Sequence, residues 1–374
     1  MAIYVVEQGD SVNSIAAKYG VLPETIIYDN QLIPPYNLMV GQALLIREEE
    51  QAKGSGPSFY VGGYAYPYIN AWVLEQTLPY LDYLYVFSYG FTEEGNLIPP
   101  ALDDSWMISF AKDSATAPVL VLTPFGPDGN FNNALISAVV NNPSARENLK
   151  NQIIAKIEEK EFEGLDIDFE YILAEDREAF VDFVAYMKAA VSELGYPVSV
   201  ALAPKTSATQ TGLLYEGKDY PALGAIADYV LLMTYEWGYT YGPPMAVAPL
   251  NKVREVVEYA ITEIPPEKIH LGVPNYGYDW PLPFVKGTTK AETIGNVQAV
   301  ERAVEYGAPI RFDETARSPF YLYEREDTMH EVWFEDVRSM QATFDLIKEY
   351  GLRGAGYWNI MRLFRANWIL LSHN

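Results

Sequence analysis

The stretch EGLDIDFEY at residues 163–171 constrains the fold more than any other part of the chain. Its apolar and acidic residues alternate with the period of two that a β-strand requires. Asp166, Asp168 and Glu170 therefore share one face of a strand, at intervals of roughly 6.5 to 7 Å. The other face is apolar enough to lie under helices. We therefore expect the acidic face to point into a functional interior rather than into bulk solvent.

The alternation of strand-like and helical stretches from Ser58 onward predicts the fold class. We expect an α/β fold, a (β/α)8 TIM barrel spanning residues 58–374, with one helix at 176–194 that keeps a single apolar stripe. Strands seven and eight are too far apart for one helix to join them, so a small α+β insertion is expected at about 280–335. It would hold a helix at 296–306 and strands near Ile310, Tyr321 and Val332. The predicted barrel strands cover residues 59–64, 83–88, 118–122, 164–170, 198–203, 229–235, 269–274 and 354–358.

Residues 1–47 predict a separate small unit with the order strand, helix, helix, strand. Ser11 is suited to cap the first helix, and Pro23 is suited to the first turn of the second. Residues 48–57 are charged and then rich in Gly and Ser. Such a composition predicts a flexible linker between the small unit and the barrel.

Composition narrows the chemistry that the chain can perform. The formal net charge of −24 argues against nucleic acid and against an anionic membrane surface as partners. The chain has no cysteine and only three, widely separated histidines, so we expect no metal site and no cofactor. The longest apolar runs are too short to cross a bilayer, and the N-terminus lacks the features of a secretory signal. Carboxylate chemistry is what remains.

Reactive groups of a parallel barrel lie at the carboxyl ends of its strands. Glu170 ends the fourth predicted strand, Tyr235 ends the sixth and Trp358 ends the eighth. Other aromatic and polar residues at or near strand ends are candidates for contact with substrate. They are Tyr64, Tyr89, Trp237, Asn275, Tyr276 and Tyr278.

These motifs resemble those of glycoside hydrolase family 18, the chitinase-like barrels. Residues 163–170 are similar to the family signature Asp-x-x-Asp-x-Asp-x-Glu, with Glu163 in place of the first Asp. Residues 233–236 resemble its Met-x-Tyr-Asp motif, with Glu236 in place of Asp, and Trp358 resembles its barrel-floor Trp. Three matches in the correct order, spread over most of the barrel, are far more specific than any one of them.

The resemblance implies a role for each matching residue. Glu170 would be the proton donor, and Asp166 and Asp168 would crowd it so that it keeps its proton. Asp168 would also orient the substrate's acetamido N–H, while the Tyr235 hydroxyl would hold the acetamido carbonyl. Trp358 would form the floor under the sugar. Cleavage would retain configuration, because family 18 uses the substrate's own acetamido oxygen as nucleophile.

The N-terminal unit resembles a LysM module, through residues 4–11 and 40–44. LysM modules bind N-acetylglucosamine-containing polymers such as peptidoglycan and chitin in a groove between two loops. By this resemblance, the partner is such a polymer and the module tethers the enzyme to it. The groove residues would be Gly9, Asp10 and Ser11 on one side, and Leu32, Ile33 and Pro34 on the other.

The combination of a LysM module, Glu163, Glu236 and no secretory signal resembles the spore cortex-fragment-lytic branch of family 18. It implies an N-acetylglucosaminidase that acts on spore-cortex peptidoglycan, is associated with the spore or the cell wall, and works as a monomer. Two other hypotheses stay open. The same residues suit a chitinase or an endo-β-N-acetylglucosaminidase on chitin or N-glycan cores, and a non-catalytic carbohydrate-binding lectin would keep the cleft without turnover.

Overall fold

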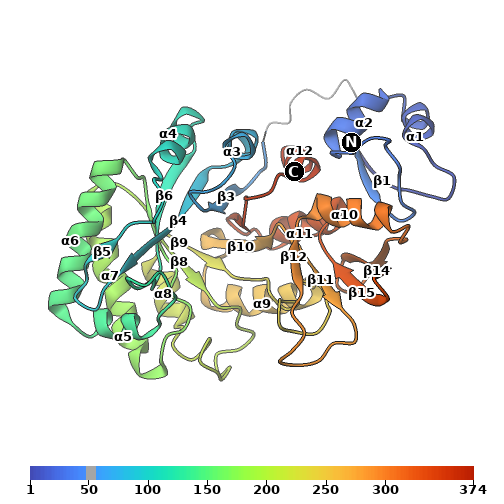
Figure 1. Cartoon of the computed structure of the whole chain (residues 1–374). Helices are drawn as coiled ribbons and strands as arrows, with labels where there is room; N and C mark the ends of the chain where they lie inside the picture. The colour runs from blue at the N-terminus through green and yellow to red at the C-terminus, as the bar shows by residue number, and fades with distance from the viewer. Residues whose placement is uncertain (48–55) are drawn as a thin grey trace.

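A closed barrel of parallel strands forms the larger part of the molecule (Figure 1). The computed structural model describes residues 1–47 and 56–374. The strand order is β3-β16-β10-β9-β8-β7-β6-β4, and β3 also pairs with β4, which closes the barrel. The predicted fold class is therefore confirmed. The barrel strands are β3 (Tyr60–Ala65), β4 (Tyr83–Phe91), β6 (Ala117–Leu122), β7 (Leu165–Ile167), β8 (Val198–Leu202), β9 (Tyr229–Leu232), β10 (Ile269–Pro274) and β16 (Gly354–Trp358).

Helices surround the barrel and bury their apolar stripes against it. In α7 the stripe is the predicted one, since Phe180, Phe183, Val184, Met187 and Val191 are all buried. A short strand, β5 (Leu97–Ile98), pairs antiparallel with the end of β4. The helices around the barrel are α3 (Ala71–Thr77), α4 (Ser105–Asp113), α5 (Ala134–Val140), α6 (Pro143–Lys160), α7 (Arg177–Glu193), α8 (Tyr220–Ile226), α9 (Leu250–Glu263), α11 (Val337–Glu349) and α12 (Arg365–Leu371), with single 3₁₀ turns at Leu78–Tyr80, Ala174–Asp176 and Pro266–Lys268. In the part of the chain that the structure describes, no helix is long and apolar enough to cross a membrane.

An insertion follows β10 and carries its own antiparallel sheet, in the order β12-β11-β15-β14-β13. It begins earlier than the predicted residue 280, because β11 pairs with β15 from Tyr278 onward. Strands β11 and β12 were not predicted. The insertion comprises β11 (Gly277–Pro281), β12 (Glu292–Ile294), α10 (Asn296–Glu305), β13 (Arg311–Asp313), β14 (Ser318–Arg325) and β15 (Thr328–Trp333).

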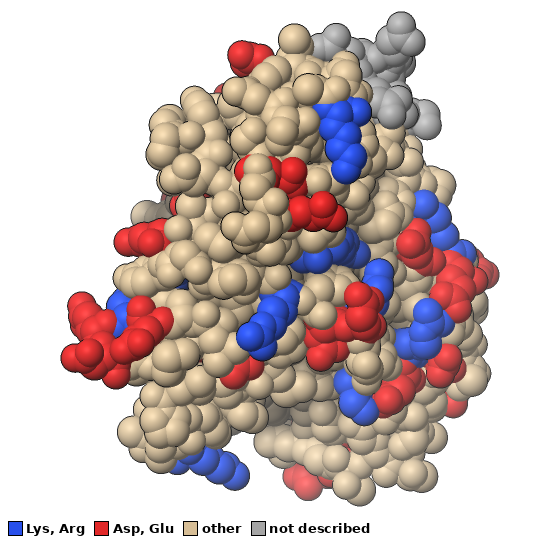
Figure 2. Space-filling model, turned by 90° about the vertical axis from the view of Figure 1, so that its right-hand side faces the viewer, with Lys and Arg blue, Asp and Glu red and all other residues tan. Residues whose placement is uncertain are grey.

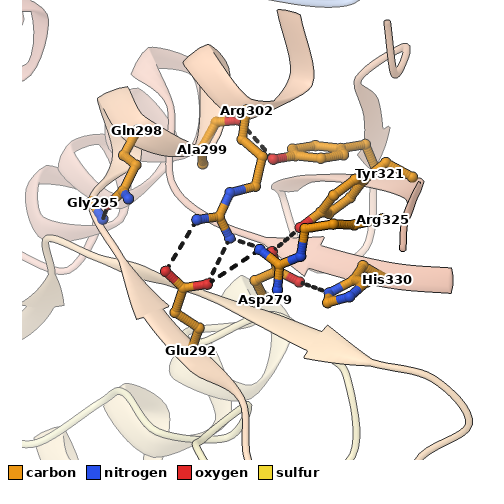
Figure 3. Close-up of polar contacts among 10 residues, drawn as sticks. Asp279, Glu292, Gly295, Gln298, Ala299, Arg302, Tyr321, Arg325 and His330 are labelled. Carbon is orange, nitrogen blue, oxygen red and sulfur yellow. Dashed lines mark hydrogen bonds and ion pairs between the residues drawn. The ribbon is translucent and has the colours of Figure 1, made fainter. Parts of the chain in front are cut away.

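One buried carboxylate, that of Asp279 on β11, ties the insertion together (Figure 3). Arg302 of α10 donates to Asp279 and also to Glu292 of β12, at 3.0 and 3.1 Å. The Tyr323 hydroxyl donates to Asp279 Oδ2 at 2.5 Å, and His330 Nδ1 lies 2.7 Å from Oδ1. Asp279 thus joins a helix and three strands of the insertion.

The N-terminal unit has the predicted order β1 (Ala2–Val5), α1 (Val12–Tyr19), α2 (Pro23–Asp29) and β2 (Ala43–Ile46). The two strands pair antiparallel. Ser11 caps α1 by accepting the Ser14 backbone N–H at 3.1 Å, and Pro23 begins α2. Most of the predicted linker, residues 48–55, lies outside the described residues.

The N-terminal unit packs directly on the barrel domain, beside α10 and α12 (Figure 1). Leu45 of β2 is fully buried and belongs to the same hydrophobic cluster as the barrel helices. Backbone groups of the unit bond to the other domain as well: the Val40 carbonyl accepts from Ile310 N at 2.9 Å, and the Gly41 carbonyl accepts from Arg338 Nη2 at 3.1 Å. Arg365 donates to the Tyr28 carbonyl at 2.9 Å and its guanidinium lies 3.9 Å from the centre of the Tyr28 ring. The contact is therefore an interdomain interface with a shared apolar core.

On the face shown in Figure 2, acidic and basic side chains are scattered among other residues, and over the right-hand part they lie next to one another.

Candidate active site

The acidic stretch runs along the inside of the barrel, as its alternation predicts. Strand β7 ends at Ile167, yet the chain continues extended, because Asp168 N donates to Leu122 O of β6 at 2.9 Å. On the outer face Phe169 packs against Phe183 of α7, with ring centres 5.5 Å apart. Asp166 and Asp168 are buried and Glu170 is partly exposed. The three carboxylates therefore form an acidic ladder that leads from the barrel interior to its open end.

Asp166, at the inner end of the acidic ladder, is held by two neighbouring strands. The Tyr64 hydroxyl of β3 donates to Oδ2 at 2.8 Å, and the Ser199 hydroxyl of β8 donates to Oδ1 at 2.6 Å. Burial raises the pKa of Asp166 to about 6, against the opposing effect of these two bonds. Ser199 was not predicted. It is the one hydroxyl residue in the apolar strand VSVAL, and the alternation of side chains along that strand could have indicated which face it occupies.

Asp168 and Glu170 lie two residues apart at the outer end. Burial, then the charge of Glu170, then that of Asp166 raise the pKa of Asp168 well above its ordinary value. Burial likewise raises the pKa of Glu170. Among the described residues, Asp168 Oδ1 has no hydrogen-bond partner. The protonated form of each carboxyl group is therefore favoured relative to that of an exposed carboxylate.

A buried lysine stands behind the acidic ladder, and sequence reasoning missed it. Lys218 precedes α8, is fully buried, and donates from Nζ to the carbonyls of Phe169 and Ala201. Burial lowers its pKa to about 8, while the carboxylates of the ladder act in the opposite direction. No local pattern marked this residue, because it lies in an irregular loop and reaches the ladder only through tertiary packing.

Trp358, at the end of β16, lies among aromatic rings of neighbouring strands. Its ring centre is 5.7 Å from that of Tyr64, 4.9 Å from Phe87 and 6.1 Å from Tyr66. Phe87 and Tyr66 were not predicted as site residues. The indole is only partly buried, so this cluster forms an apolar floor with one open side.

Tyr235 lies three residues beyond the end of β9, and its ring fills a space left by a glycine. A Cβ atom on Gly272 of β10 would lie 2.7 Å from Tyr235 Cε1 and 2.4 Å from Leu232 O. Glycine is therefore required at this position for Tyr235 to keep its place. Burial raises the pKa of the Tyr235 hydroxyl strongly, and the nearby charges of Asp168 and Glu170 add to the effect. The hydroxyl therefore stays protonated and can donate.

Glu236 links the insertion to the site. Its φ of +67° is unusual for a residue with a side chain, and it directs the carboxylate toward β11. The Tyr276 hydroxyl donates to Glu236 Oε1, and the Tyr278 hydroxyl donates to both carboxylate oxygens at 2.9 and 3.1 Å. The charge of Glu236 also acts to raise the pKa of Glu170. Both tyrosines are buried, so they act on the site through their hydrogen bonds to Glu236 and do not offer an exposed ring for stacking on a sugar.

Two predicted substrate-contacting residues are engaged within the protein. Tyr89 is fully buried outside the barrel interior, where its hydroxyl donates to Asp104 Oδ2 at 2.6 Å. Asn275 is 2% exposed, and its amide donates to the carbonyls of Asn359 and Arg362, at 3.0 and 2.9 Å. The end of a strand does not by itself tell which way a side chain points. Trp237 packs against the main hydrophobic core but is partly exposed, so its contact with substrate stays a prediction.

The residue at the first position of the signature lies far from the chemistry. Glu163 precedes β7 and lines a small cavity with Lys112 and Tyr83, at the amino-terminal end of the barrel. Its substitution for Asp therefore does not alter the acidic ladder.

The two loops predicted to form the LysM groove are both at the surface. Asp10 accepts the Glu7 backbone N–H at 2.8 Å and the Tyr4 hydroxyl at 2.7 Å, and both bonds lower its pKa. Gly9 has a φ of +91°, which favours glycine there. Leu32, Ile33 and Pro34 line a cavity of about 160 Å³ whose other wall is α10 and the start of α11. A glycan groove between the two loops stays a prediction.

Comparison with known proteins identifies the class. The model of the glycosyl hydrolases family 18 matches residues 109–362, and the model of the LysM domain matches residues 4–47. The chain belongs to glycosyl hydrolase family 18 and carries a LysM domain. Together the two domains indicate a ligand among the N-acetylglucosamine-containing polymers.

Relatives narrow the branch of the family. The chain is 36% identical to the cortical fragment-lytic enzyme of Bacillus subtilis (strain 168), over 100% of this chain and 97% of that protein. The crystal structure of the Bacillus cereus spore cortex-lytic enzyme SleL is similar with a TM-score of 0.93 and 35% identity, over 100% of this chain and 98% of that one. A chitinase from Chromobacterium violaceum shares the fold, with a TM-score of 0.77 and 24% identity over 84% of this chain and 98% of that one. The chain is therefore a family 18 glycosidase that is similar over its whole length to the cortical fragment-lytic enzymes.

Proposed function

We propose that the protein is a retaining N-acetylglucosaminidase that cleaves N-acetylglucosamine linkages of spore-cortex peptidoglycan. The observation that carries the proposal is the acidic ladder, in which the partly exposed Glu170 ends a row of buried carboxylates and has a raised pKa. A raised pKa favours the protonated form of a carboxyl group, which is the form that a general acid requires. The names of the relatives support the choice of polymer.

In the proposed mechanism Glu170 protonates the oxygen of the departing sugar. The acetamido oxygen of the bound sugar attacks its own anomeric carbon, so that the protein supplies no covalent nucleophile. Asp168, whose Oδ1 lacks a partner among the described residues, accepts the acetamido N–H and stabilises the positive charge of the ring that forms. The Tyr235 hydroxyl donates to the acetamido carbonyl group.

Water then opens the cyclic intermediate with Glu170 as the base. Two inversions at the anomeric carbon give net retention. Trp358 and its aromatic neighbours provide the apolar surface under the sugar ring, since a flat indole suits the apolar face of a pyranose. The charge of Asp166 helps to raise the pKa of Asp168 and so opposes its ionisation before the intermediate forms.

The LysM domain would hold the enzyme on the same polymer, through Gly9, Asp10 and Ser11 facing Leu32, Ile33 and Pro34. An enzyme so retained would be found with the spore or the cell wall. Holding two sites on one polymer raises the effective concentration of the second without adding catalytic contacts.

The deciding experiment is the identity of the reducing ends released from purified spore-cortex peptidoglycan, measured by mass spectrometry with the wild type beside Glu170→Gln. New N-acetylglucosamine ends that are absent with the variant support the proposal. N-acetylmuramic acid ends would make the enzyme a muramidase and overturn it.

A second candidate substrate is chitin or the chitobiose core of N-glycans, because these carry the same acetamido group that Asp168 and Tyr235 would bind. Release of sugars from chitin oligomers with none from cortex would favour it. Binding of both polymers without any release would favour a lectin instead.

A further inference from the structure

Lys218 is a charged group that the mechanism above does not use. Its ammonium is fully buried on the outer side of the acidic ladder, where it donates to the carbonyl of Phe169 and, at 3.1 Å, to that of Ala201. Phe169 lies between Asp168 and Glu170 in the chain. The ammonium therefore bonds to the stretch of backbone that joins the two catalytic carboxylates.

An ammonium at such a site needs more than two carbonyls to keep its proton. Burial removes its hydration, and carbonyl dipoles restore only part of that loss. The Phe180 ring, 5.4 Å away, adds a weak cation–π contact. The remaining stabilisation comes from negative charge on the other side of the strand. Conversely, the ammonium favours ionised forms of the carboxylates.

We propose that Lys218 is a positioning residue that sets how many protons the Asp168–Glu170 pair carries, by supplying a positive charge next to the backbone between them. The inference rests on the proposed function for the role of Glu170 as acid. Without Lys218 the pair would hold its protons too tightly, and Asp168 would be neutral when the intermediate needs its charge.

The other cationic groups near Lys218 have hydrogen-bond or ion-pair partners outside the acidic ladder. Lys205 is also buried, but its Nζ donates to the Lys218 carbonyl at 3.2 Å, and Arg177 is paired with Asp219 at 2.8 Å. Burial lowers the pKa of Lys205, and its charged neighbours are Arg177, Asp219 and Glu263. The groups that face Lys218 or the acidic ladder are Asp166, Asp168, Glu170, Lys205, Asp219, Arg177, Tyr220, Tyr64, Tyr235 and Glu236.

The test is the pH profile of kcat/KM on a soluble N-acetylglucosamine oligomer. For Lys218→Met we expect both limbs to move to higher pH by about one unit, since a nearby positive charge lowers carboxylate pKa values. Lys218→Arg keeps the charge and should stay close to the wild-type profile. Lys205→Met removes a buried ammonium from the same loop and is the matched control, with no movement of the limbs. Unchanged limbs in Lys218→Met, or an equal movement in Lys205→Met, would overturn the proposal.

Thermal unfolding at pH 6.5, below the pKa of Lys218, gives a readout independent of turnover. In Lys218→Met the negative charges of the carboxylates no longer face a positive charge. Adding Glu170→Gln should therefore raise the Tm more in Lys218→Met than in the protein that keeps Lys218. Equal gains in the two backgrounds would show that Lys218 acts only through its backbone bonds. If the wild type cleaves no N-acetylglucosamine polymer, the proposed function fails, while this unfolding comparison still decides the role of Lys218.

Discussion

Asp168 and Asp279 are two buried aspartates that the fold treats in opposite ways. Asp279 is 1% exposed, and its carboxylate meets Arg302, His330 and Tyr323. Asp168 is 7% exposed, has like charges as neighbours, and leaves Oδ1 without a partner among the described residues. Fully partnered buried carboxylates fix structure, whereas an unpartnered one is a cost that only a function explains.

The comparison also separates the two parts of the barrel domain. The insertion uses its buried charge to join β11, β14, β15 and α10. The barrel interior holds its buried charges near one another, in a state that is unfavourable until substrate supplies an N–H and a glycosidic oxygen. The carboxylate that stabilises the fold of the insertion is therefore different from the carboxylates that serve the chemistry of the barrel.

The largest expected effect is on turnover. Glu170→Gln should lower kcat by at least about a thousandfold, because it removes the general acid and keeps the shape. Binding of a soluble oligomer should change little. Glu163→Gln, at the other end of the same strand, is the matched control and should leave kcat unchanged. Similar losses in both variants would contradict the assignment of the acid.

The two aspartates should differ in stability. Asp279→Asn removes the anion shared by Arg302 and His330, and should lower the free energy of unfolding by about 3 kcal/mol. Asp168→Asn removes a buried charge that lacks partners, so it should leave that free energy unchanged or raise it, while turnover falls. Urea denaturation at pH 7 measures both. A larger loss in Asp168→Asn than in Asp279→Asn would reverse the comparison.

The pH dependence of the free energy of unfolding should show the cost of ionising the buried carboxyl groups of the acidic ladder. A carboxyl group whose pKa is raised by folding stabilises the protein at low pH, and this contribution is lost as the pH rises through the folded value. For Asp166, with a pKa of about 6, the window runs from about pH 4 to pH 6. The wild type should lose roughly 2 kcal/mol relative to Asp166→Asn across that window. Urea titrations at pH 4 and pH 6.5 check this, and a constant difference would refute it.

The smallest effects concern two tyrosine hydroxyls that donate to buried carboxylates. Tyr323→Phe and Tyr64→Phe should each lower the free energy of unfolding by about 1 kcal/mol, since each loses one hydrogen bond. Only Tyr64→Phe should move the pH profile of kcat/KM, and toward higher pH, because its bond lowers the pKa of Asp166. If Tyr323→Phe moved the profile as well, the two networks would be coupled.

Much of the fold and the row of carboxylates could be predicted from local patterns. The period of two at 163–171 and the 3.6-residue period of α7 are properties of short stretches, which sequence reasoning can read. The assignment of Tyr278 to the end of a barrel strand failed, because only two residues separate β10 from β11 and no turn signal marks the change of sheet.

Residues that act from a distance in sequence could not be found in this way. Lys218 lies about fifty positions from the strand it supports, in a loop without periodicity. Tyr89 directly follows the strand predicted at 83–88 but faces outward, because β4 runs on to Phe91 with a register irregularity between Val86 and Tyr89. Such irregularities change which face a side chain occupies and leave no trace in the pattern of residue types.

The shared core between the LysM domain and the barrel changes how attachment to a polymer works. Leu45 is buried among barrel-domain residues, and Arg365 and Arg338 bond to the LysM backbone. The two domains then rotate as one body. If the LysM domain holds the polymer as proposed, the distance between the held part of the glycan and the bond that is cut would be constant. Truncation of the first domain would remove part of the barrel domain's own core.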